Sequence, residues 1–260
     1  VLEKEFHLCE STQPIETPSV AQNHPDDGSA ETPPFNSADY WAARYRHGGN
    51  SGAGSYGRLA RFKADTLNAF VREKDIRSLI EFGCGDGAQL SLADYPQYLG
   101  VDVAIESVRM CQDKFGGDES KSFVHAPAFQ SQRADVTLSL DVIFHLVEDR
   151  VFHDYMCRLF RSSKRYVVIY SSNSNDGQPA PHVRHRRFTD WIDVYHADFQ
   201  LIRQVLNPYP PDQDPQNESF ADFYIYERGQ RKPHGLPGEL VISLTSYPRR
   251  YPTLELTLRR

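Results

Sequence analysis

The stretch Leu79-Ile-Glu-Phe-Gly-Cys-Gly-Asp-Gly87 decides the fold of this chain. It reads as an apolar strand that runs into a turn with three glycines, Gly83, Gly85 and Gly87, and we expect a helix over residues 88–93 to follow. Glycines at such a turn let the backbone approach a ligand closely, and a helix start presents free N–H groups to it. The stretch therefore predicts a site for a small-molecule cofactor.

Two acidic residues narrow the class of cofactor. The glycine spacing, which with Ala88 also satisfies the loose dinucleotide pattern, leaves both NAD and S-adenosylmethionine open. Glu81 lies two positions before the first glycine, where a dinucleotide fold usually has an apolar residue and where a carboxylate suits a ligand with an ammonium group. Asp102 ends the next expected strand, where its oxygens can accept hydrogen bonds from both ribose hydroxyls. The two acids together favour S-adenosylmethionine.

Around this stretch, short apolar runs alternate with longer amphipathic ones, which is typical of a parallel sheet with helices on both faces. The two late apolar runs are separated by a proline-rich loop instead of a helix, so we expect them to pair as an antiparallel finish to the sheet. The expected strands cover residues 78–82, 98–102, 122–125, 136–140, 166–170, 199–205 and 220–227, and the expected helices cover 56–72, 88–93, 105–115, 150–160 and 188–197.

Composition and charge exclude several classes of protein. The 260 residues carry a formal net charge of -6, without the basic excess of a dedicated nucleic-acid binder. No stretch approaches the roughly 20 apolar residues of a membrane span, and the first residues lack the order of a secretory signal, so we expect a cytoplasmic protein. The four cysteines form no CxxC pair, which argues against a zinc site.

Glu81, the three glycines and the run Gly100-Val-Asp102 resemble the cofactor motifs of class I, Rossmann-like S-adenosylmethionine-dependent methyltransferases, over about residues 40–227. The resemblance implies an α/β fold with a doubly wound, mixed seven-stranded sheet, helices on both faces and an antiparallel last strand. It also implies that Glu81, Gly83, Gly85 and Gly87 line the methionine end of the cofactor and that Asp102 binds the ribose.

The adenine end departs from the pattern of this family. Many of its members place an Asp soon after the third strand to reach the adenine amino group, whereas this chain reads Phe123-Val-His-Ala-Pro-Ala-Phe129. Backbone groups and Phe129 are the expected substitutes.

Catalytic candidates follow the expected fourth strand, within residues 139–149. Asp141 and His145 are expected near the transferred methyl group, on one face if the segment is helical, because the carboxyl ends of strands face the ligand crevice in this fold. Asp141 also counts as a cofactor contact. His145 is the first candidate for a general base, since its ordinary pKa of about 6.5 leaves a neutral imidazole, with His182 or His185 next. The alternative for His145 is a histidine hydrogen-bonded at a helix rim.

Two loops are candidates for contact with the acceptor. Residues 182–188 concentrate Arg184, Arg186 and Arg187, whose guanidinium groups fit phosphate or carboxylate oxygens, although the same loop reads equally well as a solvated basic segment. The glycine-rich loop 48–54, followed by Tyr56, is expected to close over the cofactor, and Tyr56 is a candidate substrate contact. A metal site built from His182, His185 and Asp141 has little support, and we expect none.

The end of the chain bears on the acceptor. Residues 240–254 resemble the opening strand and first helix of nucleotide-sugar-dependent glycosyltransferases of bacterial polysaccharide pathways, to which similar methyltransferase domains occur fused. The expected organisation is a disordered leader (1–36), a methyltransferase domain with an N-terminal helical lid (37–228), and a linker with the truncated start of a glycosyltransferase whose remainder lies downstream (229–260).

The resemblance implies an O-methyltransferase that acts on a sugar hydroxyl of a bacterial glycan, or on its sugar-phosphate precursor, at the inner face of the membrane through fused or partner enzymes. The alternatives are a methyltransferase of a small anionic metabolite, a nicotinamide-dependent oxidoreductase, and a non-catalytic cofactor-binding module that regulates a fused glycosyltransferase.

Overall fold

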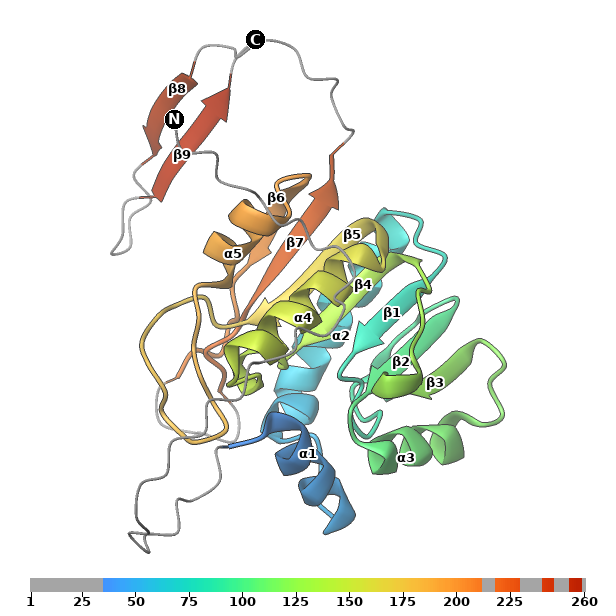
Figure 1. Ribbon diagram of the computed structural model, residues 1–260. Coiled ribbons are helices and arrows are strands. Elements are labelled where there is room, and N and C mark those ends of the chain that lie inside the picture. Colours follow the sequence, from blue (N-terminus) through green and yellow to red (C-terminus); the bar gives the residue numbers. More distant parts are fainter. Residues whose placement is uncertain (1–34, 212–217, 230–239, 246–252, 259–260) are drawn as a thin grey trace, which may run out of the picture. The chain divides into compact units, whose positions relative to one another are not determined.

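The computed structural model describes residues 35–211, 218–229, 240–245 and 253–258 (Figure 1). Its contacts divide the chain into two units, Val1–Arg228 and Gly229–Arg260, each of which is described by itself. Of the predicted leader, only residues 35–36 lie within the described part, and there the Asn36 side chain accepts a hydrogen bond from Asp39 N (2.9 Å) as the N-cap of the first helix.

The larger unit is built on a seven-stranded mixed sheet with the order β3-β2-β1-β4-β5-β7-β6. The strands are β1 (Leu79–Phe82), β2 (Tyr98–Asp102), β3 (Lys121–His125), β4 (Ala134–Leu140), β5 (Ser163–Ser171), β6 (Phe199–Val205) and β7 (Asp222–Arg228). The first five run parallel, while β7 lies antiparallel between β5 and β6. The predicted fold class is therefore confirmed.

Helices cover both faces of this sheet (Figure 1). They are α1 (Ser37–Arg46), α2 (Gly57–Glu73), α3 (Ile105–Phe115), α4 (Asp149–Arg161) and α5 (Phe188–Tyr195), with short 3-10 turns η1 (Ala53–Ser55), η2 (Leu90–Leu92), η3 (Ala126–Ala128) and η4 (Ile143–His145). Strand β5 shows how the two cores form: Tyr166, Val168 and Tyr170 pack with α2 on one face, and Val167 and Ile169 pack with α4 and α5 on the other. None of the helices in the described ranges is long and apolar enough to cross a membrane.

One predicted helix is wrong. Residues 88–93 contain only the 3-10 turn η2 (Leu90–Leu92) where an α-helix was expected. The Asp86 side chain accepts a hydrogen bond from Ala88 N (2.9 Å), a local turn that competes with helix initiation, and Pro96 follows soon after.

The smaller unit is a hairpin. Strand β8 (Leu240–Thr245) agrees with the strand expected there and pairs antiparallel with β9 (Thr253–Leu258), while most of the helical segment that the resemblance implied, residues 246–252, lies outside the described residues. Thr253–Leu258 reads Thr-Leu-Glu-Leu-Thr-Leu, and this alternation of leucine with polar residues is a period-two pattern that favours a strand.

Candidate active site

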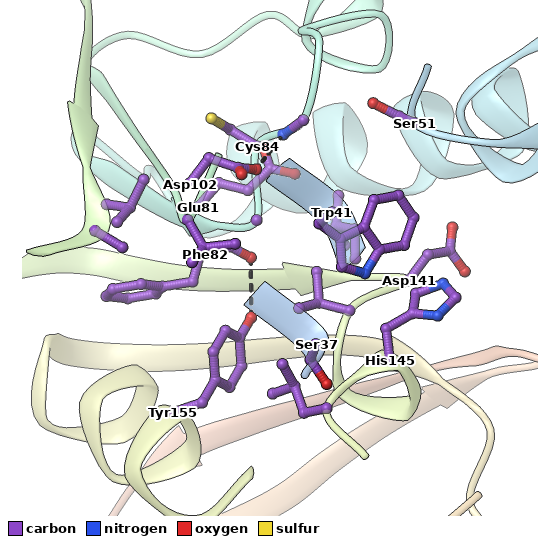
Figure 2. Close-up of a pocket in the computed structure, with 18 of the residues that line it drawn as sticks. Ser37, Trp41, Ser51, Glu81, Phe82, Cys84, Asp102, Asp141, His145 and Tyr155 are labelled. Carbon is purple, nitrogen blue, oxygen red and sulfur yellow. Dashed lines mark hydrogen bonds between the residues drawn. The ribbon is translucent and has the colours of Figure 1, made fainter. Parts of the chain in front are cut away.

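A cavity of about 330 Å³ opens where the parallel strands β1, β2 and β4 end, and α1 forms one of its walls (Figure 2). The residues that line it include Ser37, Trp41, Glu81, Asp102, Asp141, His145 and Tyr155. Ligands of open α/β sheets bind outside the carboxyl ends of the strands, and the volume lies in the range of small-molecule sites. The fold therefore places several of the predicted residues around one ligand-sized space.

The glycine turn allows a close approach to this cavity. Gly83, Gly85 and Gly87 all have positive φ angles, between 57° and 83°. A Cβ atom at Gly83 would come within 2.5 Å of a Val142 methyl group, and one at Gly87 within 2.6 Å of the Phe115 ring. Gly83 and Gly85 line the cavity directly, while Gly87 lies behind them against α3. Both the strain and the lack of space restrict these positions to glycine.

The backbone N–H groups of this turn are already bonded within the protein. Gly83 N and Cys84 N donate to Val101 O (2.7 and 3.2 Å), and Gly85 N donates to the Asp102 carboxylate (2.9 Å). The expectation of a helix start with free N–H groups is therefore wrong at these positions. The groups of this turn that remain for contact with a ligand are therefore the neighbouring side chains and not these N–H groups.

Two acids lie on either side of the turn at the cavity wall. Burial of Glu81 raises the pKa of its carboxyl group to about 7, although the Tyr98 hydroxyl donates a hydrogen bond to it (2.6 Å) and opposes the shift. Burial also raises the pKa of Asp102, whose oxygens accept hydrogen bonds from Gly85 N and Ala104 N (both 2.9 Å). A carboxylate has about four lone-pair positions, so Asp102 retains acceptor capacity for ligand hydroxyls.

A buried lysine completes this end of the cavity. Lys63 of α2 has only 1% of its side chain exposed, and its ammonium group lies 2.6 Å from Asp141 Oδ2. Asp141 has a φ of 57°, rare for a residue with a side chain, so the turn after β4 holds it in a strained conformation. Lys63 was not predicted from the sequence as a residue of the site. The feature that could have indicated it is its position: Lys63 lies four residues from both Leu59 and Leu67, on the apolar face of α2.

His145 lies in η4, so the predicted helical face shared with Asp141 does not exist, yet both residues line the cavity. The Nδ1 atom of His145 lies 2.8 Å from the carbonyl oxygen of His182. Because a carbonyl only accepts, Nδ1 carries the proton and Nε2 is left as the basic nitrogen. Burial lowers the pKa of His145 to about 4, so the ring is neutral near pH 7. Trp41 packs edge-on against it, with ring centroids 4.8 Å apart.

The glycine-rich loop 48–54 docks onto the glycine turn through a serine. Ser51 N donates to Asp86 Oδ2 (3.0 Å), and Asp86 N donates back to Ser51 Oγ (2.9 Å). The Tyr56 hydroxyl also donates to Asp86 (2.6 Å), and burial together with this bond raises the pKa of Tyr56 to about 12. Tyr56 thus holds the loop in place and does not line the cavity, whereas Ser51 does.

The other predicted residues lie outside the cavity wall; they are Phe129, His182, His185, Arg184, Arg186 and Arg187. Phe129 packs edge-on behind Phe82, with ring centroids 5.2 Å apart. His185 Nδ1 lies 2.7 Å from Ser172 Oγ. Among the described residues, no group of three His, Cys, Asp or Glu side chains is placed to hold a metal ion.

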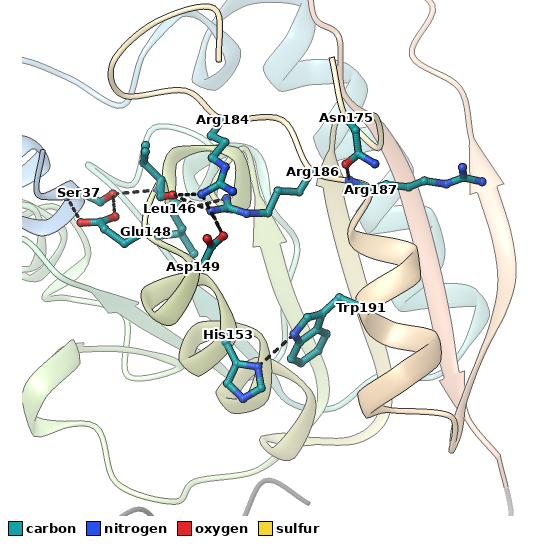
Figure 3. A network of polar contacts seen from close by, with 11 residues as sticks. Ser37, Leu146, Glu148, Asp149, His153, Asn175, Arg184, Arg186, Arg187 and Trp191 are labelled. Atoms are coloured by element: carbon teal, nitrogen blue, oxygen red, sulfur yellow. Dashed lines mark hydrogen bonds and ion pairs between the residues drawn. The ribbon is translucent and has the colours of Figure 1, made fainter. Parts of the chain in front are cut away.

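The basic loop is cross-linked to the start of α4 (Figure 3). Arg186 donates to the carbonyl oxygens of Leu146 (2.6 Å) and Val147 (2.7 Å), and both Arg184 and Arg186 pair with Asp149 (3.0 and 3.1 Å). Only 14% of the Arg186 side chain is exposed, so this residue fixes the loop in position.

Comparison with known proteins agrees with this geometry. A family profile described as a methyltransferase domain matches residues 80–168, the segment from β1 into β5 that includes the glycine turn. No curated protein matches the chain. The methyltransferase match decides between the two cofactors that the glycine spacing left open.

Several solved structures that are similar to this chain are methyltransferases. Magnesium protoporphyrin IX methyltransferase (ChlM) from Synechocystis PCC 6803, with bound S-adenosylhomocysteine, has a TM-score of 0.56 at 15% identity, covering 74% of this chain and 98% of that chain. The N-methyltransferase NodS from Bradyrhizobium japonicum WM9, in complex with S-adenosylhomocysteine, has a TM-score of 0.57 at 12% identity, covering 75% and 100%. The methyltransferase domain of bacterial CtHen1-C has a TM-score of 0.50 at 18% identity, covering 65% and 97%. At these identities the likeness concerns the fold. The family match over residues 80–168 indicates a methyltransferase that uses S-adenosylmethionine, and the larger unit has the fold of the class I enzymes.

Proposed function

We propose that this enzyme is an O-methyltransferase that acts on a sugar hydroxyl of a glycan or of its precursor. The observation that carries the proposal is the pairing of His145 and Trp41 at the cavity wall. His145 Nε2 is free of a proton, and Trp41 lies beside it with an aromatic ring. A basic nitrogen next to an aromatic ring fits a sugar, because the C–H face of a pyranose packs on the ring while a hydroxyl meets the base.

The residues at the other end of the cavity fit the cofactor. Its methionine end carries an ammonium and a carboxylate, and the cavity offers the carboxylates Glu81 and Asp141 to the first and the buried ammonium of Lys63 to the second. Asp102 is proposed to bind the ribose hydroxyls. Phe129 acts indirectly in this proposal, by fixing the Phe82 ring in the wall.

When bound, S-adenosylmethionine supplies an electrophilic methyl group on a sulfonium, so the protein must align the acceptor and remove one proton. In our proposal the His182 carbonyl fixes the tautomer of His145, and Nε2 receives the proton of the acceptor hydroxyl. A pKa of about 4 makes this nitrogen a weak base, so proton transfer accompanies the formation of the new C–O bond, which acidifies the hydroxyl as it forms. His182 and His185 then have supporting roles.

The resemblance of residues 240–254 to the start of a glycosyltransferase supports the same class of acceptor, and we include such a domain as the proposed fusion partner.

The test is transfer of labelled methyl from S-adenosylmethionine to fractionated polysaccharides, followed by sugar analysis for methyl ethers. We expect label in an O-methyl sugar. His145→Asn retains a donor to the His182 carbonyl but lacks the base, so turnover should fall about 10²- to 10⁴-fold while affinity for S-adenosylhomocysteine changes little. The exposed His47, at the end of α1, supplies the control His47→Ala. Label found only in a small amine or carboxylic acid would contradict the proposal.

A further inference from the structure

A second hollow lies between α4, α5 and the loop that joins β5 to α5, outside the cofactor cavity. Aromatic and basic side chains dominate its wall; they are Phe152, His153, Trp191, Tyr195, Arg184, Arg186 and Arg187, with Asn175 and Gln178 beside them. Figure 3 shows Trp191 and His153 on the two helices and Arg184, Arg186 and Arg187 on the loop, with the Arg187 side chain directed away from the other two arginines.

The hollow and the cofactor cavity lie on opposite faces of α4. Val151, Tyr155 and Arg158 of this helix line the cavity, whereas Phe152 and His153 line the hollow. An α-helix with its side chains is about 10 Å across, so the two spaces are separated by roughly that distance. A single sugar cannot occupy both, but an oligosaccharide that passes over the start of α4 can.

The hollow has more positive than negative charge. Arg184 and Arg186 share the single carboxylate of Asp149. Arg187 faces Asp190 at 3.3 Å, but both side chains are more than 60% exposed, and an exposed pair of this kind contributes little. Arg187 is therefore available to an incoming anion, while Arg186 is committed to the carbonyl oxygens of Leu146 and Val147.

The aromatic side of the hollow forms a platform. The Trp191 and Tyr195 rings lie 4.8 Å apart, and the His153 ring packs edge-on against both. Trp191 Nε1 donates to His153 Nδ1 (3.1 Å), so the indole N–H is already bonded. Tyr195 is 43% exposed. Such a platform fits a pyranose ring, and the exposed side chain of Arg187, a residue that also lines the hollow, can reach an anionic group on that ring.

We propose that this hollow binds an anionic sugar unit of an extended acceptor, while another unit of the same chain meets His145. The inference rests on the proposed function, because it names the class of glycan: one that carries carboxylate or phosphate groups a short distance from the methylated hydroxyl. Arg187 binds the anion and Trp191 packs on the sugar ring.

Binding can be tested without methyl transfer. The chain contains two tryptophans, Trp41 and Trp191, so Trp41→Phe leaves Trp191 as the sole tryptophan fluorophore. Titration of this variant with oligogalacturonate, a phosphorylated glucan oligosaccharide and a neutral maltooligosaccharide should change Trp191 fluorescence saturably, with at least one anionic ligand bound about tenfold or more tightly than the neutral one. Which anionic ligand binds more tightly distinguishes carboxylate from phosphate recognition.

Arg187→Gln in the same background should weaken binding of the anionic ligand about tenfold or more. The matched control is Arg77→Gln, because Arg77 forms a similarly exposed pair with Asp75 far from the hollow in sequence. Equal affinity for neutral and anionic ligands, no fluorescence change with any of them, or an equal effect of the two substitutions would overturn the inference.

The failures of the two proposals can be told apart. If a neutral glycan is methylated and no anionic ligand binds near Trp191, the proposed function stands and this inference falls. If anionic oligosaccharides bind at Trp191 but no sugar of any kind is methylated, the proposed function falls, and the assignment of the hollow to an acceptor falls with it.

Discussion

The pH dependence of cofactor binding is the sharpest consequence of the burial of Glu81. Its pKa is raised to about 7, and in the proposed site the ligand's ammonium group pairs with the ionised form. At pH 6 about one-tenth of the empty protein carries an ionised Glu81, against about nine-tenths at pH 8, so affinity for S-adenosylhomocysteine should rise about tenfold between these values. Isothermal titration calorimetry at the two pH values measures this directly.

Glu81→Gln should bind more weakly at pH 8 and lose this pH dependence, because the amide keeps an acceptor for the Tyr98 hydroxyl but cannot ionise. The exposed Glu119 supplies the control, and Glu119→Gln should retain the tenfold change. Affinity that is flat between pH 6 and 8 in the unsubstituted protein, or a rise that persists in Glu81→Gln, would refute the reasoning.

The same pKa makes a prediction about stability, with the sign set by its direction. The folded state holds its proton up to about pH 7, whereas the unfolded chain loses it near the ordinary value of 4.5, so stability falls as pH rises through this interval. At about 1.4 kcal/mol per pH unit, the contribution of Glu81 is on the order of 3 kcal/mol. Glu81→Gln should remove this component from the pH dependence of unfolding by urea, and an unchanged dependence would contradict it.

Three further predictions concern contacts around the cavity. Lys63→Met leaves the Asp141 carboxylate without its cation and should lower the free energy of unfolding by about 3 kcal/mol, roughly 6–12 °C in Tm. Adding Asp141→Asn removes the unpaired charge, so the double variant should recover most of the stability but not the affinity for the cofactor. Thermal unfolding of both variants measures the loss and the recovery. Ser51→Ala removes the hydrogen bond between loop 48–54 and Asp86 N, so the affinity for S-adenosylhomocysteine should fall about fivefold with little change in Tm. An affinity equal to that of the unsubstituted protein would show that the loop does not close the site. Tyr155→Phe deprives the Phe82 carbonyl of its buried partner and should cost about 1–2 kcal/mol in urea unfolding, and no loss would show that this hydrogen bond does not stabilise the fold.

The sheet was predictable from the sequence because its strands are short apolar runs between turn signals, and the antiparallel pairing of β6 with β7 followed from the absence of a helix between them. The helix at 88–93 was not predictable by the same rules. Its failure depends on the Asp86 side chain bonding Ala88 N, a choice between two local hydrogen-bond patterns that apolar spacing does not report.

At the site, the sequence indicated residues whose position follows directly from the strands, such as Glu81 and Asp102. Lys63 was missed because its significance depends on a tertiary pairing with Asp141, and a lone lysine in an amphipathic helix is usually solvated. Arg186, with 14% of its side chain exposed, shows the converse: a basic loop reads as ligand-binding in the sequence, while in the fold its guanidinium donates to backbone carbonyls.

The hydrogen bond from Gly85 N to Asp102 is one of a short series of bonds that links the cavity wall to the glycine-rich loop 48–54. Gly85 and Asp86 are covalent neighbours, and Asp86 N is bonded to Ser51, so a single peptide link separates the acid proposed to meet the ribose from the serine that holds the glycine-rich loop. A nucleoside that competes for Asp102 therefore changes the restraint on that loop. Arrival and departure of the methyl donor should accordingly be readable as a change in amide hydrogen exchange over residues 48–54, even before any acceptor is known.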